Sequence, residues 1–108
     1  MYTIDYYSDE VRLDINNLPL TIRAHYKRYT DRMMIYGSHL GEPHTKALGK
    51  GLFELRIKGG EGIARVFYCT LVGKKIVMLH SFIKKTPKTP PQEMETAIRR
   101  MKEIKNDA

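Results

Sequence analysis

Residues 52–88, LFELRIKGGEGIARVFYCTLVGKKIVMLHSFIKKTPK, contain three runs in which apolar and polar side chains alternate. Alternation with a period of two predicts β-strands, because successive side chains of a strand point to opposite faces of the sheet. Two short glycine-containing segments, residues 59–62 and 72–75, separate the runs and predict tight turns. We therefore expect an antiparallel sheet core at the centre of the fold.

The two turns also predict how the strands pair. We expect Lys58 to pair with Ile63 and Val72 to pair with Lys75. The facing pairs that result are Arg56–Arg65, Arg65–Phe82, Phe67–His80 and Ile63–Lys84. One face of the sheet then gathers Glu54, Arg56, Arg65, Phe67, His80, Phe82 and Lys84. The other face, which we expect to be the core, holds Phe53, Leu55, Ile57, Ala64, Val66, Tyr68, Val77, Leu79 and Ile83. A shift of one residue in either hairpin would undo this separation.

The flanking segments predict one further strand and three helices. Residues 2–7 are rich in tyrosine and β-branched side chains, and Ser8 is positioned to cap a short helix after them. Apolar spacings of three and four predict a second helix from Ile22 to Tyr36, whose tyrosines we expect in the core rather than stacked on bases, and an amphipathic C-terminal helix after Thr89. Residues 38–51 contain Pro43 and three glycines and predict an irregular connector.

The expected order of elements is β-α-α-β-β-β-α. Strands that follow one another and helices that flank them are typical of an α+β domain with its helices packed on one face of the sheet. A chain of 108 residues fits a single domain over residues 1–108.

The net charge of +7 is concentrated in one part of the chain. Residues 44–88 carry ten basic and two acidic side chains, whereas the segments on either side are close to neutral. A basic cluster of this kind favours a polyanionic partner, because each neutralised phosphate releases counterions. The alternative is a solvated basic surface that keeps the protein soluble.

Several classes of protein are disfavoured. No run approaches the roughly 18 apolar residues of a membrane-spanning helix, and the N-terminus lacks a signal-peptide pattern. The single cysteine, Cys69, excludes an internal disulfide and disfavours a zinc site, so we expect a cytoplasmic protein. We expect His39 and His44 to be loop histidines rather than metal ligands. The sequence predicts no cofactor.

The polar face of the predicted sheet favours RNA chemistry. RNA carries its own nucleophile, the 2′-hydroxyl, so a protein needs only to orient the attack, stabilise charge on the phosphate and manage two protons. Arg56 and Arg65 are candidate phosphate clamps, and Lys84 and Lys85 are candidates for charge neutralisation or proton donation. His80 is a further catalytic candidate, because histidine is the residue type that most often transfers protons at neutral pH, although a histidine taken alone is more often structural.

Other residues of this face are candidates for RNA binding. Phe67 and Phe82 offer flat surfaces for base stacking, unless the connector or the C-terminal helix covers them. Lys46, Lys58 and Lys88 are further candidates for phosphate contacts. Because carboxylates are scarce among these residues, a magnesium-dependent nuclease is disfavoured. We expect Glu54 to pair with Arg56 or Arg65 rather than to act as a base.

Three motifs, GLFELR at residues 51–56, IARVFY at 63–68 and VMLHSFIKKTPKTP at 77–90, resemble the RelE/HigB superfamily of type II toxin–antitoxin toxins. The similarity spans essentially the whole chain and is strongest to the phage-derived HigB-like branch. It implies a RelE-like fold and a toxin that cleaves mRNA in the ribosomal A site. It also implies a cognate helix-turn-helix antitoxin, through which alone the toxin meets operator DNA.

The resemblance assigns the site to Arg56, Arg65, Lys84 and Lys85. RelE-type toxins often carry a catalytic tyrosine near the C-terminus and some HigB toxins a histidine, but this chain has neither after Lys88. Tyr68 matches a motif tyrosine, yet the alternation places it on the core face, so we expect it to be structural. Two alternatives stay open: a non-catalytic partner that binds nucleic acid or the antitoxin in autoregulation, and a gyrase-directed toxin like those of the ParE branch.

Overall fold

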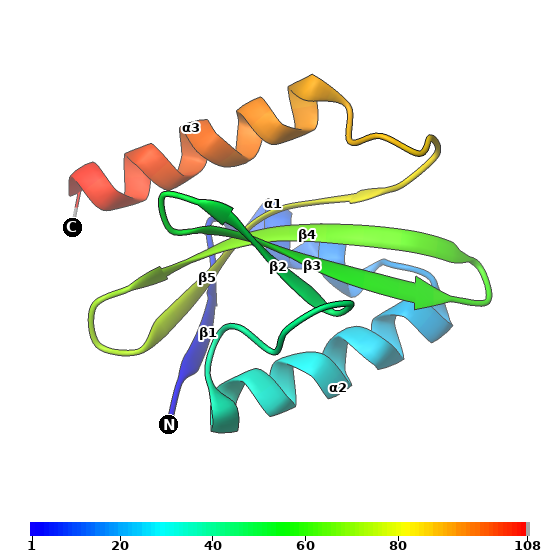
Figure 1. The fold of residues 1–108 in the computed structure, drawn as a ribbon, viewed down its shortest axis with the longest axis horizontal. Coiled ribbons are helices and arrows are strands. Elements are labelled where there is room, and N and C mark those ends of the chain that lie inside the picture. Colours follow the sequence, from blue (N-terminus) through cyan, green and yellow to red (C-terminus); the bar gives the residue numbers. More distant parts are fainter. Residues whose placement is uncertain (108) are drawn as a thin grey trace.

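The structure, a computed structural model, describes residues 1–107 and contains a sheet flanked by helices (Figure 1). The strands are β1 (Thr3–Tyr6), β2 (Thr45–Gly49), β3 (Leu52–Gly59), β4 (Gly62–Leu71) and β5 (Lys75–Ile83). The helices are α1 (Asp9–Asn16), α2 (Leu20–Tyr36) and α3 (Pro91–Asp107). The fold class is therefore α+β, as predicted.

The strands form one sheet in the order β1-β5-β4-β3-β2. Strand β1 pairs with β5 in parallel and the other pairs are antiparallel, so the sheet is mixed rather than antiparallel throughout. Strand β2 lies within the segment that was predicted to be an irregular connector, and the prediction was wrong there. The glycines of that segment do not prevent a strand, because Gly49 and Gly51, with φ of 96° and 85°, form the turn that returns the chain into β3.

The hairpin between β3 and β4 has the predicted register. Lys58 faces Ile63 and Arg56 faces Arg65. The turn is built on glycines at both strand ends, and Gly62 adopts a φ of 138° that other residues rarely take.

The hairpin between β4 and β5 differs from the prediction at its turn but agrees with it at its far end. Leu71, not Val72, faces Lys75. The register shifts between Phe67 and Tyr68, so that β5 contains one extra residue, a β-bulge at Leu79. Beyond the bulge the predicted pairs Arg65–Phe82 and Phe67–His80 are present. The bulge offsets the register shift that the longer turn introduces. The predicted pairing is therefore restored beyond the bulge.

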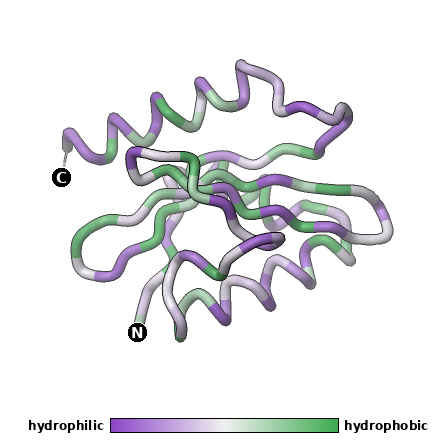
Figure 2. The backbone as a smooth tube through the Cα atoms, in the orientation of Figure 1, coloured by the Kyte–Doolittle hydropathy of each residue, from purple (hydrophilic) through white to green (hydrophobic). Residues whose placement is uncertain are grey.

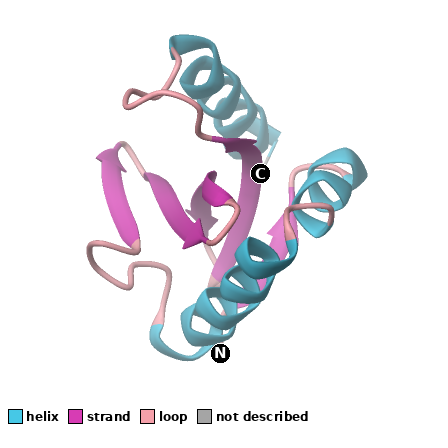
Figure 3. Cartoon of the chain, turned by 90° about the vertical axis from the view of Figure 1, so that its right-hand side faces the viewer, coloured by secondary structure: helices cyan, strands magenta, loops and turns pink. Residues whose placement is uncertain are grey.

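Helices cover both faces of the sheet, so the expectation that they pack on one face was wrong. Helix α3 lies above the sheet and α2 below it in Figure 1, and the view turned by 90° in Figure 3 shows α3 on the side away from α1 and α2. The face under α3 is also apolar. It is built by alternate residues of β4 and of the half of β5 that lies nearest the β4–β5 turn. Because of the changed turn, Val77 and Leu79 belong to this face and not to the one that holds Tyr68.

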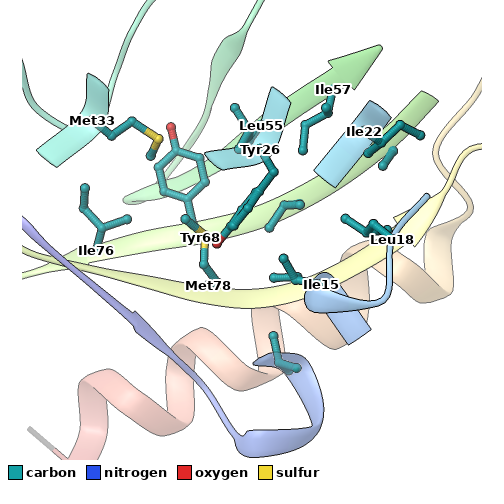
Figure 4. Close-up of a cluster of buried hydrophobic side chains, with 13 residues drawn as sticks. Ile15, Leu18, Ile22, Tyr26, Met33, Leu55, Ile57, Tyr68, Ile76 and Met78 are labelled. Carbon is teal, nitrogen blue, oxygen red and sulfur yellow. The ribbon is translucent and has the colours of Figure 1, made fainter. Parts of the chain in front are cut away.

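The larger core lies between the sheet and helices α1 and α2. Its buried residues are Val11, Ile15, Leu18, Ile22, Tyr26, Met33, Leu55, Ile57, Ala64, Val66, Tyr68, Ile76 and Met78 (Figure 4). Tyr68 is completely buried there, as predicted, and its hydroxyl donates a hydrogen bond to the carbonyl of Ser38 at 2.5 Å. Burial raises the pKa of this phenol, which suits a structural role.

The smaller core lies under α3. It consists of Leu52, Phe67, Cys69, Val77, Leu79, Ala97 and Met101. The apolar stripe of α3 faces it, and Figure 2 shows hydrophobic and hydrophilic residues alternating along the helices and along strands such as β3. Arg100 further attaches α3 to the sheet, since its Nη1 donates to the carbonyl of Leu79 at 2.8 Å. Helix α3 thus covers the half of this face that lies nearest the β4–β5 turn and leaves the other half open.

Candidate functional site

A basic cleft lies at the part of the α3-side face that is formed by β2, β3 and β4. It has a volume of about 210 Å³ and is lined by Glu42, Pro43, His44, Thr45, Lys46, Glu54, Arg56 and Arg65. Strand pairing explains how the charged residues meet, because Lys46 faces Glu54 across β2–β3 and Arg56 faces Arg65 across β3–β4. We call this set of eight residues the basic cleft.

The floor of the basic cleft holds a buried ion pair. Nη1 of Arg65 donates to Oε1 of Glu54 at 2.7 Å, and the two side chains retain only 14% and 7% of their accessible surface. The Nε of Arg65 is buried without a hydrogen-bond partner among the described residues. The prediction that Glu54 pairs with an arginine of this face is confirmed. In contrast, Arg56 is exposed and free to meet a ligand from solvent.

Lys84 lies beside the cleft because β5 ends next to the start of β4. Its backbone N–H donates to the carbonyl of Ile63 at 2.8 Å, which is the predicted pairing. Its pKa is lowered, chiefly by desolvation and then by repulsion from Arg65 and Arg56, while the charge of Glu54 opposes the change. A lysine with a lowered pKa gives up its proton more readily than an ordinary surface lysine.

The remaining predicted lysines take different positions. Lys46 lines the basic cleft, and Lys58 lines an adjoining hollow of about 350 Å³ together with Tyr29, Pro43, His44 and Arg56. Lys85 and Lys88 are exposed in the loop between β5 and α3, and neither lines the basic cleft. The structure therefore brings Lys46, Arg56, Arg65 and Lys84 together but not Lys85 or Lys88.

The aromatic residues predicted on this face are covered rather than open. Phe67 is completely buried under α3, so it has no surface on which a base can stack, and that expectation was wrong for this conformation. Phe82 is half-buried and stacks between Phe67 and His80, with ring centroids 5.8 and 6.2 Å away. The physical reason is the apolar stripe of α3, which needs an apolar partner and finds it here.

His80 belongs to the contact with α3 and does not line the basic cleft. Its Nε2 lies 3.4 Å from Oε2 of Glu93 near the start of α3. The two groups form an ion pair only when the imidazole is protonated. The sequence prediction gave one continuous polar face. The structure divides it into a basic part that is open and an aromatic part, with His80, that helps to hold α3.

Sequence reasoning missed the contribution of residues 42–45 to this site. His44 lines both the basic cleft and the adjoining hollow, its ring packs on Tyr29 at 4.7 Å, and its carbonyl accepts from the backbone N–H of Arg56 at 2.8 Å. His39 has a structural hydrogen bond: its Nδ1 and the hydroxyl oxygen of Thr45 lie 2.9 Å apart. The sequence assigned no role in the site to residues 42–45, and only the formation of β2 brings them beside β3.

A larger hollow lies elsewhere on the described surface. It has about 560 Å³, lies between β1 and α2, and is lined mainly by apolar atoms of residues such as Ile4, Leu20 and Tyr26. Size does not decide between the two sites. The basic cleft brings Lys46, Arg56 and Arg65 together beside Lys84, whose pKa is lowered, whereas the larger hollow is mainly apolar.

Two features are absent from residues 1–107. No group of three or more histidine, cysteine, aspartate or glutamate side chains is placed to hold a metal ion there. No helix in the same range is both long and apolar enough to cross a membrane.

The chain matches a known protein family. The model of the family described as phage derived protein Gp49-like (DUF891) matches residues 13–102, which is more than four fifths of the chain and includes every residue of the basic cleft. No curated protein matches the sequence.

Proposed function

The chain belongs to the family of phage-derived Gp49-like proteins, a RelE/HigB-like toxin family in general, and from that premise we propose that it is the toxin of a type II toxin–antitoxin system. Its activity is cleavage of mRNA on the ribosome, which stops translation. The observation that carries the proposal is the basic cleft, where Lys46, Arg56 and Arg65 converge beside Lys84. A cleft of this charge favours the phosphate backbone of RNA.

The proposed reaction needs no metal ion. The 2′-oxygen of the RNA attacks the adjacent phosphorus, the P–O5′ bond breaks, and the products are a 2′,3′-cyclic phosphate and a 5′-hydroxyl. The proton of the 2′-hydroxyl passes to solvent. Arg56 and Arg65 hold the non-bridging oxygens and stabilise the charge that develops on them, and Lys46 adds to the positive potential.

Lys84 is the proton donor of this proposal. Its lowered pKa allows the ammonium group to protonate the leaving 5′-oxygen, and the same charge stabilises the transition state before the transfer. His80 has no assigned proton transfer, because its ring is engaged with Phe82 and Glu93 at the base of α3. Lys85 and Lys88 contribute long-range attraction from the exposed loop.

The expected partner is a cognate antitoxin with a helix-turn-helix domain. The basic cleft favours an acidic segment of that antitoxin, since a carboxylate can take the position of the phosphate. Operator DNA is met only through the antitoxin in this proposal. A neighbouring reading frame for a small helix-turn-helix protein would support the partnership.

The variant Arg56→Ala tests the proposed cleavage. Arg56 is exposed, so its removal leaves the buried Glu54–Arg65 ion pair intact. After induction in cells, the wild type is expected to produce codon-phased mRNA 5′ ends. In a purified translation system the cuts should persist in EDTA, and Arg56→Ala should slow them about 10²-fold, as loss of one transition-state donor does.

Lys102→Ala is the matched control, since this lysine is exposed on α3 and also removes one positive charge. It should cleave like the wild type. Growth arrest with intact mRNA and induced DNA damage would contradict the proposal and favour a gyrase-directed toxin. Absence of any growth effect would favour a non-catalytic partner.

A further inference from the structure

We infer that Glu54 is a positioning residue of the basic cleft: its carboxylate orients the guanidinium of Arg65 for the transition state and at the same time weakens the binding of RNA. The inference rests on the proposed cleavage at this cleft and names a role for its buried acid. It makes Glu54 neither a general base nor a mere structural ion pair.

A single contact with Glu54 orients the guanidinium of Arg65. Glu54 faces Phe67 on β4, and Arg65 stands two residues from Phe67 on the same face, so the carboxylate meets the guanidinium diagonally across the strand pair. The contact is short, 2.7 Å from Oε1 of Glu54 to Nη1 of Arg65, and both side chains are nearly enclosed. With Nη1 held by Glu54 and Nε buried, Nη2 is the nitrogen left to meet a phosphate oxygen.

Rotation of the arginine is restricted for an energetic reason. A buried charge without a partner is costly, so the guanidinium does not leave the carboxylate to follow a ligand freely. An arginine that is oriented before the substrate arrives loses no further freedom in the transition state. Arg56, which is exposed and has no ion-pair partner among the described residues, lacks this restriction.

The charge of Glu54 acts in the opposite direction on binding. It is the one buried acid of the basic cleft, where it stands among Lys46, Arg56 and Arg65 and lowers the positive potential that attracts phosphate. Its removal should therefore strengthen RNA binding while it slows the chemical step. A residue with only a structural role would not separate the two quantities in this way.

The test compares Glu54→Gln with Glu95→Gln, which removes a negative charge from the exposed surface of α3. Binding is measured with a short RNA that carries 2′-methoxy groups and so cannot supply a nucleophile. Cleavage is measured in single turnovers on mRNA-programmed ribosomes at saturating protein. Glu54→Gln should bind the methylated RNA up to about fivefold more tightly and cleave about 10- to 100-fold more slowly. Glu95→Gln should match the wild type in cleavage.

A second variant guards against misfolding of the first. Glu54→Asp keeps the charge but withdraws the carboxylate by one methylene group, so it should leave RNA binding within about twofold while cleavage falls at least about tenfold. Circular dichroism melts identify any variant that does not fold. Cleavage by Glu54→Asp at the wild-type rate would overturn the inference, and so would parallel losses of binding and cleavage in a folded Glu54→Gln. Absence of cleavage by the wild type would instead contradict the proposed function.

Discussion

At the scale of single residues, the environment of each cation decides what it can do. Lys84 and Lys85 are neighbours in the chain, yet only Lys84 is half-buried and close enough to Arg56 and Arg65 for their charges to lower its pKa. Lys85 is exposed in the loop. Two lysines that the family resemblance assigns to the same site therefore have different proposed roles, one in proton transfer and one in long-range attraction.

The pH dependence of cleavage tests this distinction. Desolvation and the two arginines lower the pKa of Lys84, so its proton is present at low pH and is lost as pH rises through a value below that of an ordinary lysine. We expect single-turnover cleavage to fall on an alkaline limb whose midpoint lies below the usual pKa of a lysine side chain. Lys84→Ala should cleave slowly, and its pH profile should lack this alkaline limb. The profile of Lys85→Ala should retain the limb. A limb that survives in Lys84→Ala would contradict the assignment.

At the scale of elements, helix α3 determines which part of the sheet face is open. It covers Phe67 and partly covers Phe82, and the sheet beyond its reach forms the basic cleft. The β-bulge at Leu79 belongs to the same arrangement, because its carbonyl accepts from Arg100 of α3 and its extra residue restores the pairing of Arg65 with Phe82. Bulges often re-aim side chains next to functional sites in this manner.

The role of Phe67 is therefore in stability. Phe67→Ala should lower the free energy of unfolding by about 3–5 kcal/mol, since it removes a completely buried ring from the core under α3. Urea denaturation followed by circular dichroism measures this change. Val72→Ala, at a side chain that is 99% exposed in the β4–β5 turn, is the control and should change stability by less than about 0.5 kcal/mol. A stable Phe67→Ala that had lost RNA affinity would instead restore the base-stacking interpretation.

At the scale of the whole molecule, the net charge of +7 is placed asymmetrically. Four of the cations meet at or beside the basic cleft, namely Lys46, Arg56, Arg65 and Lys84. The apolar hollow between β1 and α2 involves other elements than β2, β3 and β4, so a ligand of one site need not contact the other.

Salt dependence of binding measures how many of these cations meet phosphate. With up to four phosphate contacts on single-stranded RNA, the slope of log K against log salt should approach about −3, which is a loss of roughly fiftyfold between 50 and 200 mM salt. Titration of the methylated RNA at several salt concentrations gives this slope. Arg56→Ala should reduce its magnitude by about 0.7. A flat response would mean that the cleft does not bind phosphate.

The sequence by itself determined the alternation of the strands, the facing of Arg56 with Arg65 and the burial of Tyr68, because these depend on local periodicity and on glycines in a short turn. Tertiary structure alone decided the rest. The pairing of β2 with β3, the bulge at Leu79 and the cover that α3 places over Phe67 all depend on contacts between distant segments. A period of two distinguishes the faces of a strand, but it does not specify which helix covers each face. For that reason Glu54, Arg56 and Arg65 of the basic cleft were predictable one by one, whereas the contribution of residues 42–45 and the boundary of the cleft were not.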